Sequence, residues 1–341
     1  MTFPSILYIG PLSEGGTCRE RKRVLEDYGY KVIDLDTVPF LEQGARLLRS
    51  FENRFLFGPN VLELNNEILK LSSDLKRIDI IWVDKGRWLF PDVLEKVKRD
   101  TGAICIHYTP DPAFTVHTSR HFFKSIKIFD LCVTTKDYEI NKYLDYGAKN
   151  ILFTLQGVDD RFNDYTKSKS NLIRNGSIFV GHCEAHYINV LKEVVTVDSS
   201  LQIYGSGWTK GASFNPKLLK SVKGEGAWGL EYPRVLASAK IGLGLLCKNY
   251  PDNFTTRSFE VPASGAMLLA ERTNAHLSLF TEGVEAEYFS SLSEMKEKLM
   301  FYLNNESALL GVAAAGQKRC LNEYHWKKVL MPVIEWIENN I

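Results

Sequence analysis

Residues 253–271, NFTTRSFEVPASGAMLLAE, combine side chains that could hold a nucleotide. Arg257 carries a planar guanidinium that suits phosphate oxygens. If Thr255 or Thr256 caps a helix here, the backbone amides of its first turn would add further phosphate donors. Glu260 follows Arg257 by one helical turn, and its carboxylate can accept hydrogen bonds from paired hydroxyls such as those of ribose. These groups predict a nucleoside diphosphate site; the alternative is a surface ion pair worth about 0.3 kcal/mol.

The position of this stretch in the predicted sheet supports the nucleotide interpretation. Residues 241–246 read as a buried strand that leads into it, and residues 266–270 read as the next strand. Gly265 is expected to end the helix between them. Ligands of open α/β sheets bind beyond the carboxyl ends of the strands. The placement therefore favours a ligand site over an ion pair.

Apolar runs alternate with helical patterns along the chain, which is typical of parallel sheets covered by helices. The alternation stops in the polar, turn-rich residues 156–177 and then restarts. The sequence therefore predicts an α/β protein with two Rossmann-like domains that face each other across a cleft, where ligands commonly bind. We place these domains at residues 1–165 and 166–324, followed by a C-terminal helix at residues 325–341.

The composition excludes several classes of protein. The chain has 341 residues, of which 42 are basic and 41 acidic, so its net charge of +1 gives no overall field for nucleic acid. Its six cysteines show no CxxC spacing, which indicates reduced thiols in the cytosol. The first residues lack the basic segment of a signal peptide, and no apolar run reaches the length of a membrane span. We expect a cytoplasmic protein.

Two loops of the first half carry further polar side chains. HYTPDP, residues 107–112, follows a predicted strand, and Asp111 or His107 could take a proton from an acceptor hydroxyl. An Asx-Pro turn capped by Asp111 is an equal alternative. In the loop DKGRW, Asp84 and Lys85 could contact the acceptor, or they could form a buried ion pair.

Two glycine-rich loops permit close backbone approach to a ligand. GPLSEGGTCRER contains Gly15 and Gly16, although its spacing is not that of G-x-G-x-x-G. In GSGW, backbone groups at Ser206 and Gly207 could bond the edge of a nucleobase. A glycine turn with Trp208 buried explains the second loop equally well.

Histidine pairs at i,i+4 spacing occur in HCEAH, with His182 and His186, and in HTSRH, with His117 and His121. This spacing can bind zinc on a helix, but no third ligand is evident. We predict no metal site. Because His182 follows a predicted strand, we expect it to contact the phosphates of the nucleoside diphosphate, which would be the donor in a group transfer.

The predicted helix at residues 40–57 mixes Arg46, Arg49 and Arg54 with apolar residues. A basic amphipathic helix can lie on an anionic membrane. More often such a stripe packs on its own domain, and we favour that interpretation here. Peripheral contact with the inner face of a membrane stays open, and it would suit a lipid-linked acceptor.

The stretch FTTRSFEVPASGAMLLAE resembles the signature of group 1 glycosyltransferases with the two-Rossmann (GT-B) architecture. It is most similar to the branch named after spore maturation and spore-coat glycosylation proteins, in which a T-x-R-x-F-E-x-x-A-x-G pattern recurs. The segments IIWVDKGRWLFPDVLEKVKRDTGAICIHYTPDP, EGVEAEYFSSLSEMKEKLMFYLNN and AAAGQKRCLNEYHW extend the resemblance over most of the chain from Asp79 onward.

The resemblance implies how the chain would hold its substrates. The C-terminal domain would bind the donor, the N-terminal domain would present the acceptor, and the last helix would cross back to the N-terminal domain. Glu260 matches the family's ribose-binding acid, while Asp252, eight positions earlier, stands near the place of a second acid. GHCEAHY lacks the family's usual Arg/Lys pair, so Arg257 with Lys210 or Lys248 would supply the charge.

We therefore predict a metal-independent hexosyl- or related transferase without a cofactor. It would move a sugar from a nucleoside diphosphate donor to a hydroxyl of a glycan, lipid-linked or protein acceptor, in the synthesis of bacterial surface polysaccharide or glycoconjugates. One alternative is an epimerase or hydrolase of the same fold, which would turn over the donor without an acceptor. The other is a non-catalytic surface-assembly protein, which would bind no nucleotide.

Overall fold

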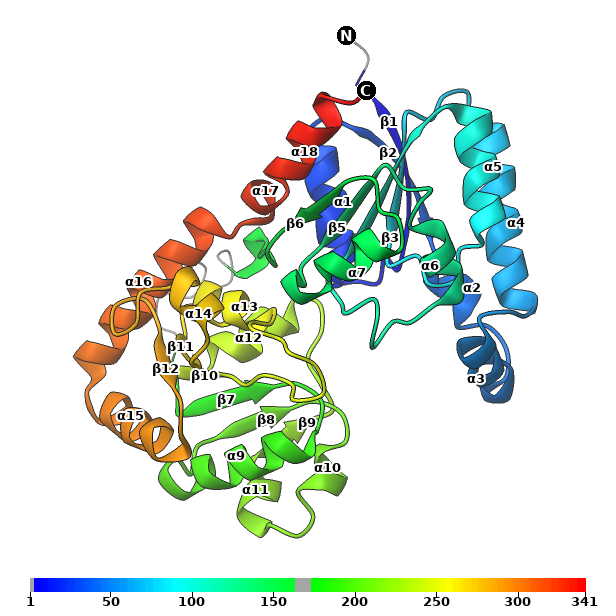
Figure 1. Cartoon of the computed structure of the whole chain (residues 1–341). Helices are drawn as coiled ribbons and strands as arrows, with labels where there is room; N and C mark the ends of the chain where they lie inside the picture. The colour runs from blue at the N-terminus through cyan, green and yellow to red at the C-terminus, as the bar shows by residue number, and fades with distance from the viewer. Residues whose placement is uncertain (1–2, 163–172) are drawn as a thin grey trace. The chain divides into compact units, whose positions relative to one another are not determined.

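The computed structural model describes residues 3–162 and 173–341. The chain forms two compact units, Met1–Leu155 with Val329–Ile341, and Gln156–Lys328. Each unit contains a six-stranded parallel sheet (Figure 1). The structure thus confirms the predicted α/β class with two Rossmann-like units. The predicted domain boundary at residues 165–166 lies outside the described residues.

The first sheet has the strand order β2-β1-β3-β4-β5-β6. Its strands read as short, continuous apolar runs because helices cover both faces of a parallel sheet. The strands are β1 (Ser5–Gly10), β2 (Lys31–Asp36), β3 (Ile80–Asp84), β4 (Ile104–Thr109), β5 (Leu131–Thr134) and β6 (Ile151–Phe153).

Helices α4 and α5 cover one face of this sheet, and α1 and α18 lie on the other (Figure 1). Apolar residues of α18, including Val333 and Ile337, are buried, and Thr154 Oγ1 donates a 2.9 Å hydrogen bond to the Val329 carbonyl. The helices of this unit are α1 (Thr17–Asp27), α2 (Val38–Leu41), α3 (Arg46–Phe55), α4 (Pro59–Asp74), α5 (Pro91–Thr101), α6 (Arg120–Ser125), the 3-10 helix η1 (Asp137–Glu139), α7 (Ile140–Asp145) and α18 (Met331–Glu338).

Two predicted helices are interrupted. The single helix expected at residues 40–57 is split into α2 and α3, with Gly44 between them at a φ of +78°. Such a left-handed conformation ends a helix and favours glycine. The helix expected at residues 325–338 is likewise divided, into α17 (Trp326–Val329) and α18, and Pro332 lies in the first turn of α18.

The second sheet has the order β12-β11-β10-β7-β8-β9. Its strands are β7 (Ser177–Val180), β8 (Gln202–Tyr204), β9 (Val222–Gly224), β10 (Ile241–Gly244), β11 (Met267–Glu271) and β12 (Glu287–Phe289). The helices of the unit are α9 (Ala185–Val197), α10 (Trp208–Gly211), α11 (Pro216–Ser221), α12 (Glu231–Ala237), α13 (Arg257–Ala263), α14 (Asn274–Leu279), α15 (Leu292–Asn304) and α16 (Glu306–Glu323). Among the described residues, no helix is both long and apolar enough to span a bilayer.

Candidate functional site

The second sheet has a switch point between β7 and β10. The chain leaves β7 towards β8 on one side, whereas β10 lies on the other side. The loops after the two strands therefore diverge, and open α/β sheets bind ligands at the crevice left between such loops. The predicted donor residues follow these two strands, because His182 comes after β7 and Arg257 comes after β10.

Arg257 lies directly at this switch point. Its Nη1 donates a 3.1 Å hydrogen bond to the Val180 carbonyl at the end of β7. Its Nη2 donates a 2.8 Å hydrogen bond to the Leu245 carbonyl just after β10. The guanidinium thus joins the carboxyl ends of both strands, and it places a fixed positive charge where an anionic ligand would bind.

The surroundings of Arg257 hold its side chain in one place. The guanidinium carbon lies 5.1 Å from the centre of the Phe179 ring, which gives a cation–π contact. Gly181 leaves room for it, since a Cβ at this position would lie 3.0 Å from Arg257 Nη1. Arg257 Nε is buried and has no hydrogen-bond partner in the described part of the chain.

Glu260 is buried in α13 and is 9% exposed. The Tyr232 hydroxyl, from α12, donates a 2.6 Å hydrogen bond to Glu260 Oε2. Burial raises the pKa of Glu260, although the bond from Tyr232 and the positive charges of Arg257 and Arg161 act in the opposite direction. The carboxylate is thus already held by one hydroxyl. Sequence reasoning missed Tyr232, because no pattern links it to Glu260.

The surface ion pair considered from sequence is absent from the described residues. Arg257 donates to main-chain carbonyls, while Glu260 accepts from Tyr232. These two side chains point to different partners, so their spacing of one helical turn does not serve a contact between them.

The start of α13 is held differently from the prediction. Thr256 occupies the cap position with helical dihedral angles and no side-chain capping bond, so capping by a threonine side chain is wrong. Instead, Ser258 Oγ accepts a 3.1 Å hydrogen bond from the Thr255 amide. Ser258 Oγ also lies 2.8 Å from His276 Nε2. Because His276 Nδ1 must donate to the Glu271 carbonyl at 2.7 Å, Nε2 accepts from Ser258.

Two further carboxylates organise the loops at this edge. Glu271, at the end of β11, accepts a 2.8 Å hydrogen bond from the Leu246 amide and forms an ion pair with Lys248. Glu184 lies 2.9 Å from His182, measured to Nε2 of the imidazole, whose side chain is 67% exposed. Lys248 is therefore engaged by a carboxylate, while His182 stands at the surface of the switch point.

The GSGW loop follows β8 at the same edge. Trp208 is fully buried, and its indole donates a 2.7 Å hydrogen bond to the Gly181 carbonyl, as the turn interpretation predicts. Ser206 and Gly207 are exposed, and the Ser206 carbonyl accepts from Cys183. Lys210 is exposed on α10. Asp252 is half-buried in the loop between β10 and α13.

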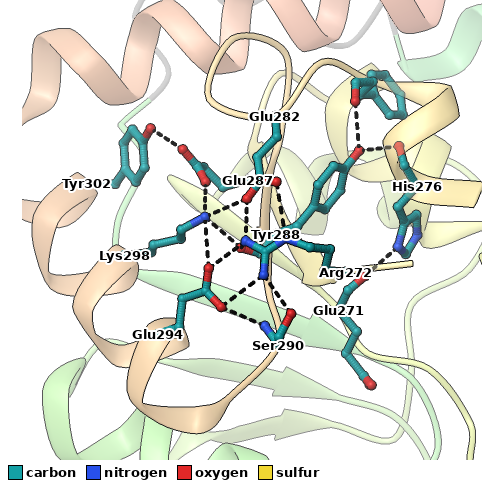
Figure 2. A network of polar contacts seen from close by, with 11 residues as sticks. Glu271, Arg272, His276, Glu282, Glu287, Tyr288, Ser290, Glu294, Lys298 and Tyr302 are labelled. Carbon is teal, nitrogen blue, oxygen red and sulfur yellow. Dashed lines mark hydrogen bonds and ion pairs between the residues drawn. The ribbon is translucent and has the colours of Figure 1, made fainter. Parts of the chain in front are cut away.

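A network of charges lies beyond this edge, where β11 and β12 meet α15 (Figure 2). Arg272 bridges Glu282 and Glu294 at 2.5 Å each, and Lys298 Nζ lies 2.6 Å from Glu287. Hydrogen bonds from Arg272 lower the pKa of Glu294 to about 2. These side chains bind one another, so we assign the network a structural role.

In the first unit, the loops after β3 and β4 bring Lys85 and Asp111 together. Lys85 Nζ lies 2.7 Å from Asp111 Oδ2, and His117 Nε2 lies 3.5 Å from the same oxygen. Burial raises the pKa of Asp111, but the charges of Lys85 and His117 outweigh it, so the net pKa is lowered. Both side chains of the close pair are about one-third exposed, at 28% and 33%. Asp111 therefore presents an ionised carboxylate that is partly exposed.

The neighbouring residues His107 and Asp84 are structural. His107 is fully buried against the Phe122 and Phe129 rings, and burial lowers its pKa to about 4. This burial excludes it from direct contact with a substrate. Asp84 forms a buried ion pair at 2.8 Å, as the second alternative predicts, but its partner is Arg21 and not Lys85.

The structure also places the remaining residues that the sequence analysis singled out. Gly15 adopts a φ of +75° in the loop between β1 and α1, and Gly16 is the cap residue of α1. The histidine pairs do not lie on single helices, because α9 begins only at Ala185 and α6 only at Arg120. No group of potential metal ligands occurs in the described ranges 3–162 and 173–341.

The switch-point residues Arg257 and Glu260 lie in a region that matches a known family. Residues 186–335 match the family described as glycosyl transferase-like, which identifies this region as a group 1-like glycosyltransferase domain. The match agrees with the predicted glycosyl transfer for this region. The chain has no significant match among curated proteins. Similarity to the spore-coat branch stays a prediction.

Several solved structures share the fold of the whole chain. Anabaena HepE in complex with UDP and glucose is 11% identical, with a TM-score of 0.62 over 98% of this chain and 100% of that one. Sucrose-phosphate synthase from Thermosynechococcus elongatus is 12% identical, with a TM-score of 0.70 over 98% of both chains. An alpha-glucosyltransferase in complex with UDP-glucose and DNA containing an abasic site is 10% identical, with a TM-score of 0.68 over 98% of this chain and 99% of that one.

Proposed function

We propose that the chain transfers a hexosyl group from a nucleoside diphosphate sugar to an acceptor hydroxyl. The donor would bind at the β7–β10 switch point of Gln156–Lys328. The position of Arg257, joined to the ends of both strands, is the observation that carries this proposal. Structural neighbours in complex with UDP or UDP-glucose support the nucleotide class.

Each donor residue would have a separate role. Arg257, through its free Nε and its charge, would stabilise the negative charge that grows on the leaving diphosphate. Glu260, oriented by Tyr232, would accept a hydrogen bond from the ribose. Thr255 Oγ1, which is buried and without a partner in the described residues, would turn towards a phosphate. Ser206 and Gly207 would meet the base with backbone groups.

On the first unit, Asp111 would accept the proton of the acceptor hydroxyl. Its ion pair with Lys85 keeps the carboxylate ionised, and a partly exposed carboxylate can reach an incoming hydroxyl. The acceptor would be a glycan or a lipid-linked sugar. We propose that no metal takes part, because Arg257 supplies the charge that a cation would otherwise bring.

Calorimetric titration with UDP, GDP and TDP and their sugars tests the proposal. We expect one of these nucleotides to bind the wild-type protein. Arg257→Ala and Glu260→Ala should each weaken that binding about 10- to 100-fold, since each removes hydrogen bonds to a charged group. Lys217→Ala, at an exposed position of α11, is the matched control and should bind as the wild type does. Failure of every nucleotide to bind would exclude the proposal.

A further inference from the structure

Helix α3 carries its apolar side chains on the outside. Leu47, Phe51 and Phe55 follow one another at i,i+4 spacing and form one stripe, and they are 85%, 50% and 48% exposed. The rings of Phe51 and Phe55 lie 4.6 Å apart. A helix of a water-soluble domain normally turns such a stripe towards the core. The expectation that this helix packs its apolar face on its own domain is therefore wrong.

The inward face of α3 is polar instead. Its only buried residue is Glu52, whose carboxylate accepts two 2.8 Å hydrogen bonds from the amide and the side chain of Asn60, in the first turn of α4. The helix is thus fixed to its unit through a buried carboxylate, and this anchoring leaves the apolar stripe uncovered. In Figure 1, α3 stands beyond the ends of α2 and α4.

The charge of this region is positive. The helix contains Arg46, Arg49 and Arg54 against the single, buried Glu52. The guanidinium of Arg54 lies 5.9 Å from the Phe55 ring, at the edge of the stripe. An apolar stripe flanked by arginines fits an interface with anionic headgroups above and acyl chains below.

Hydrogen bonds to neighbouring elements fix the position of α3 in the first unit. Arg87, from the loop after β3, donates a 3.0 Å hydrogen bond to the Asn53 carbonyl. His121, at the start of α6, bonds the Leu56 carbonyl at 3.0 Å. The helix is therefore tied to the loop after β3, which carries Lys85, and to α6, which follows the loop that carries Asp111.

We propose that α3 is an interfacial helix that binds the first unit to an anionic lipid surface. Binding would hold the carboxyl edge of the first sheet near the headgroups, where a lipid-linked acceptor hydroxyl is found. The membrane contact rests on α3 alone, whereas this acceptor class rests on the proposed glycosyl transfer. Vesicle binding and nucleotide binding are separate measurements, so either can fail without the other.

Cosedimentation with vesicles tests the contact. We expect the full chain to bind vesicles of equal parts phosphatidylcholine and phosphatidylglycerol, and to bind pure phosphatidylcholine much less. Phe51→Ser should weaken binding about tenfold, because it removes a buried ring from the lipid. Phe301→Ser is the matched control, since Phe301 is 52% exposed on α15, and it should bind as the wild type does.

A charge variant tests the same contact without changing the apolar stripe. Arg46→Gln should weaken binding to the anionic vesicles about fivefold, and added salt should reduce this difference. Circular dichroism of each variant checks that the fold is kept. Equal binding by Phe51→Ser and Phe301→Ser, or no binding by the wild type, would overturn the proposal. So would a wild-type dimer that Phe51→Ser converts to a monomer, because a second copy would then cover the stripe.

Discussion

The Tyr232 hydroxyl donates a 2.6 Å hydrogen bond to Glu260 Oε2 and so fixes the carboxylate that we assign to the ribose. The two residues belong to α12 and α13, which lie side by side in the second unit. The bond keeps a buried acid in one orientation, and it favours the ionised form that accepts hydrogen bonds.

Replacing Tyr232 by phenylalanine should therefore weaken donor binding. We expect Tyr232→Phe to raise the donor KM about 10- to 100-fold, the range for a hydrogen bond to a charged group. Burial raises the pKa of Glu260 and the Tyr232 bond lowers it, so the variant's pKa should rise further. The acid limb of the kcat/KM profile should then move to higher pH.

Tyr302→Phe is the matched control for this change. Tyr302 donates an equivalent 2.6 Å bond to Glu287 in the structural network of Figure 2. It should lower thermal stability without changing donor KM. If the two variants changed donor KM equally, the bond between Tyr232 and Glu260 would have no role in binding.

Asp111→Asn should slow the reaction without weakening the binding of the donor. Loss of a general base costs about 10²- to 10⁴-fold in kcat, whereas calorimetric nucleotide affinity should stay unchanged. Asp100→Asn is a suitable comparison, because Asp100 forms a 2.6 Å ion pair with Lys96 at the surface of α5. Wild-type kcat in Asp111→Asn would remove this residue from the proposed mechanism.

Lys85→Met should change the pH dependence in a defined direction. Burial raises the pKa of Asp111, and the Lys85 charge is the first of the effects that lower it. Without that charge the carboxyl group stays protonated to higher pH. We therefore expect the acid limb of the kcat profile to move upward in Lys85→Met, and an unmoved limb would show that Asp111 is not the titrating group.

Activity should survive removal of divalent metal ions. The proposed mechanism places Arg257 where a cation would otherwise balance the diphosphate charge. After exhaustive dialysis against EDTA, we expect the transfer rate to remain within about twofold of its starting value, because no step of this mechanism requires a metal. Loss of the rate, with recovery on adding Mg²⁺ or Mn²⁺, would contradict the metal-independent assignment.

The strands and the switch-point loops could be predicted because their signals are local. A buried parallel strand is a short apolar run, and the residues that follow it must lie at the edge of the sheet. This reasoning placed Arg257 after β10 and Asp111 after β4. It failed at residues 40–57, where the positive φ of Gly44 breaks an otherwise helical pattern.

The partners of these residues could not be predicted in the same way. Tyr232 is 28 positions from Glu260, and His276 is 18 positions from Ser258. Such contacts depend on how separate helices pack on the sheet, and no local periodicity reports that packing. Packing of α3 on its own domain was wrongly favoured for the same reason, because periodicity gives the apolar face of a helix but not what covers it.

The first unit should be sensitive to the loss of either Arg21 or Asp84. Both side chains are fully buried, and Tyr8 donates a further 2.6 Å hydrogen bond to the same carboxylate. Gly10 permits this packing, since a Cβ there would lie 2.8 Å from Asp84 Cβ. Removing one partner of a buried pair leaves an uncompensated charge, so Asp84→Asn or Arg21→Met should each cost about 3–5 kcal/mol in urea unfolding. The double variant should cost clearly less than the sum, because neither charge remains, and strictly additive losses would show that the two side chains are not energetically coupled.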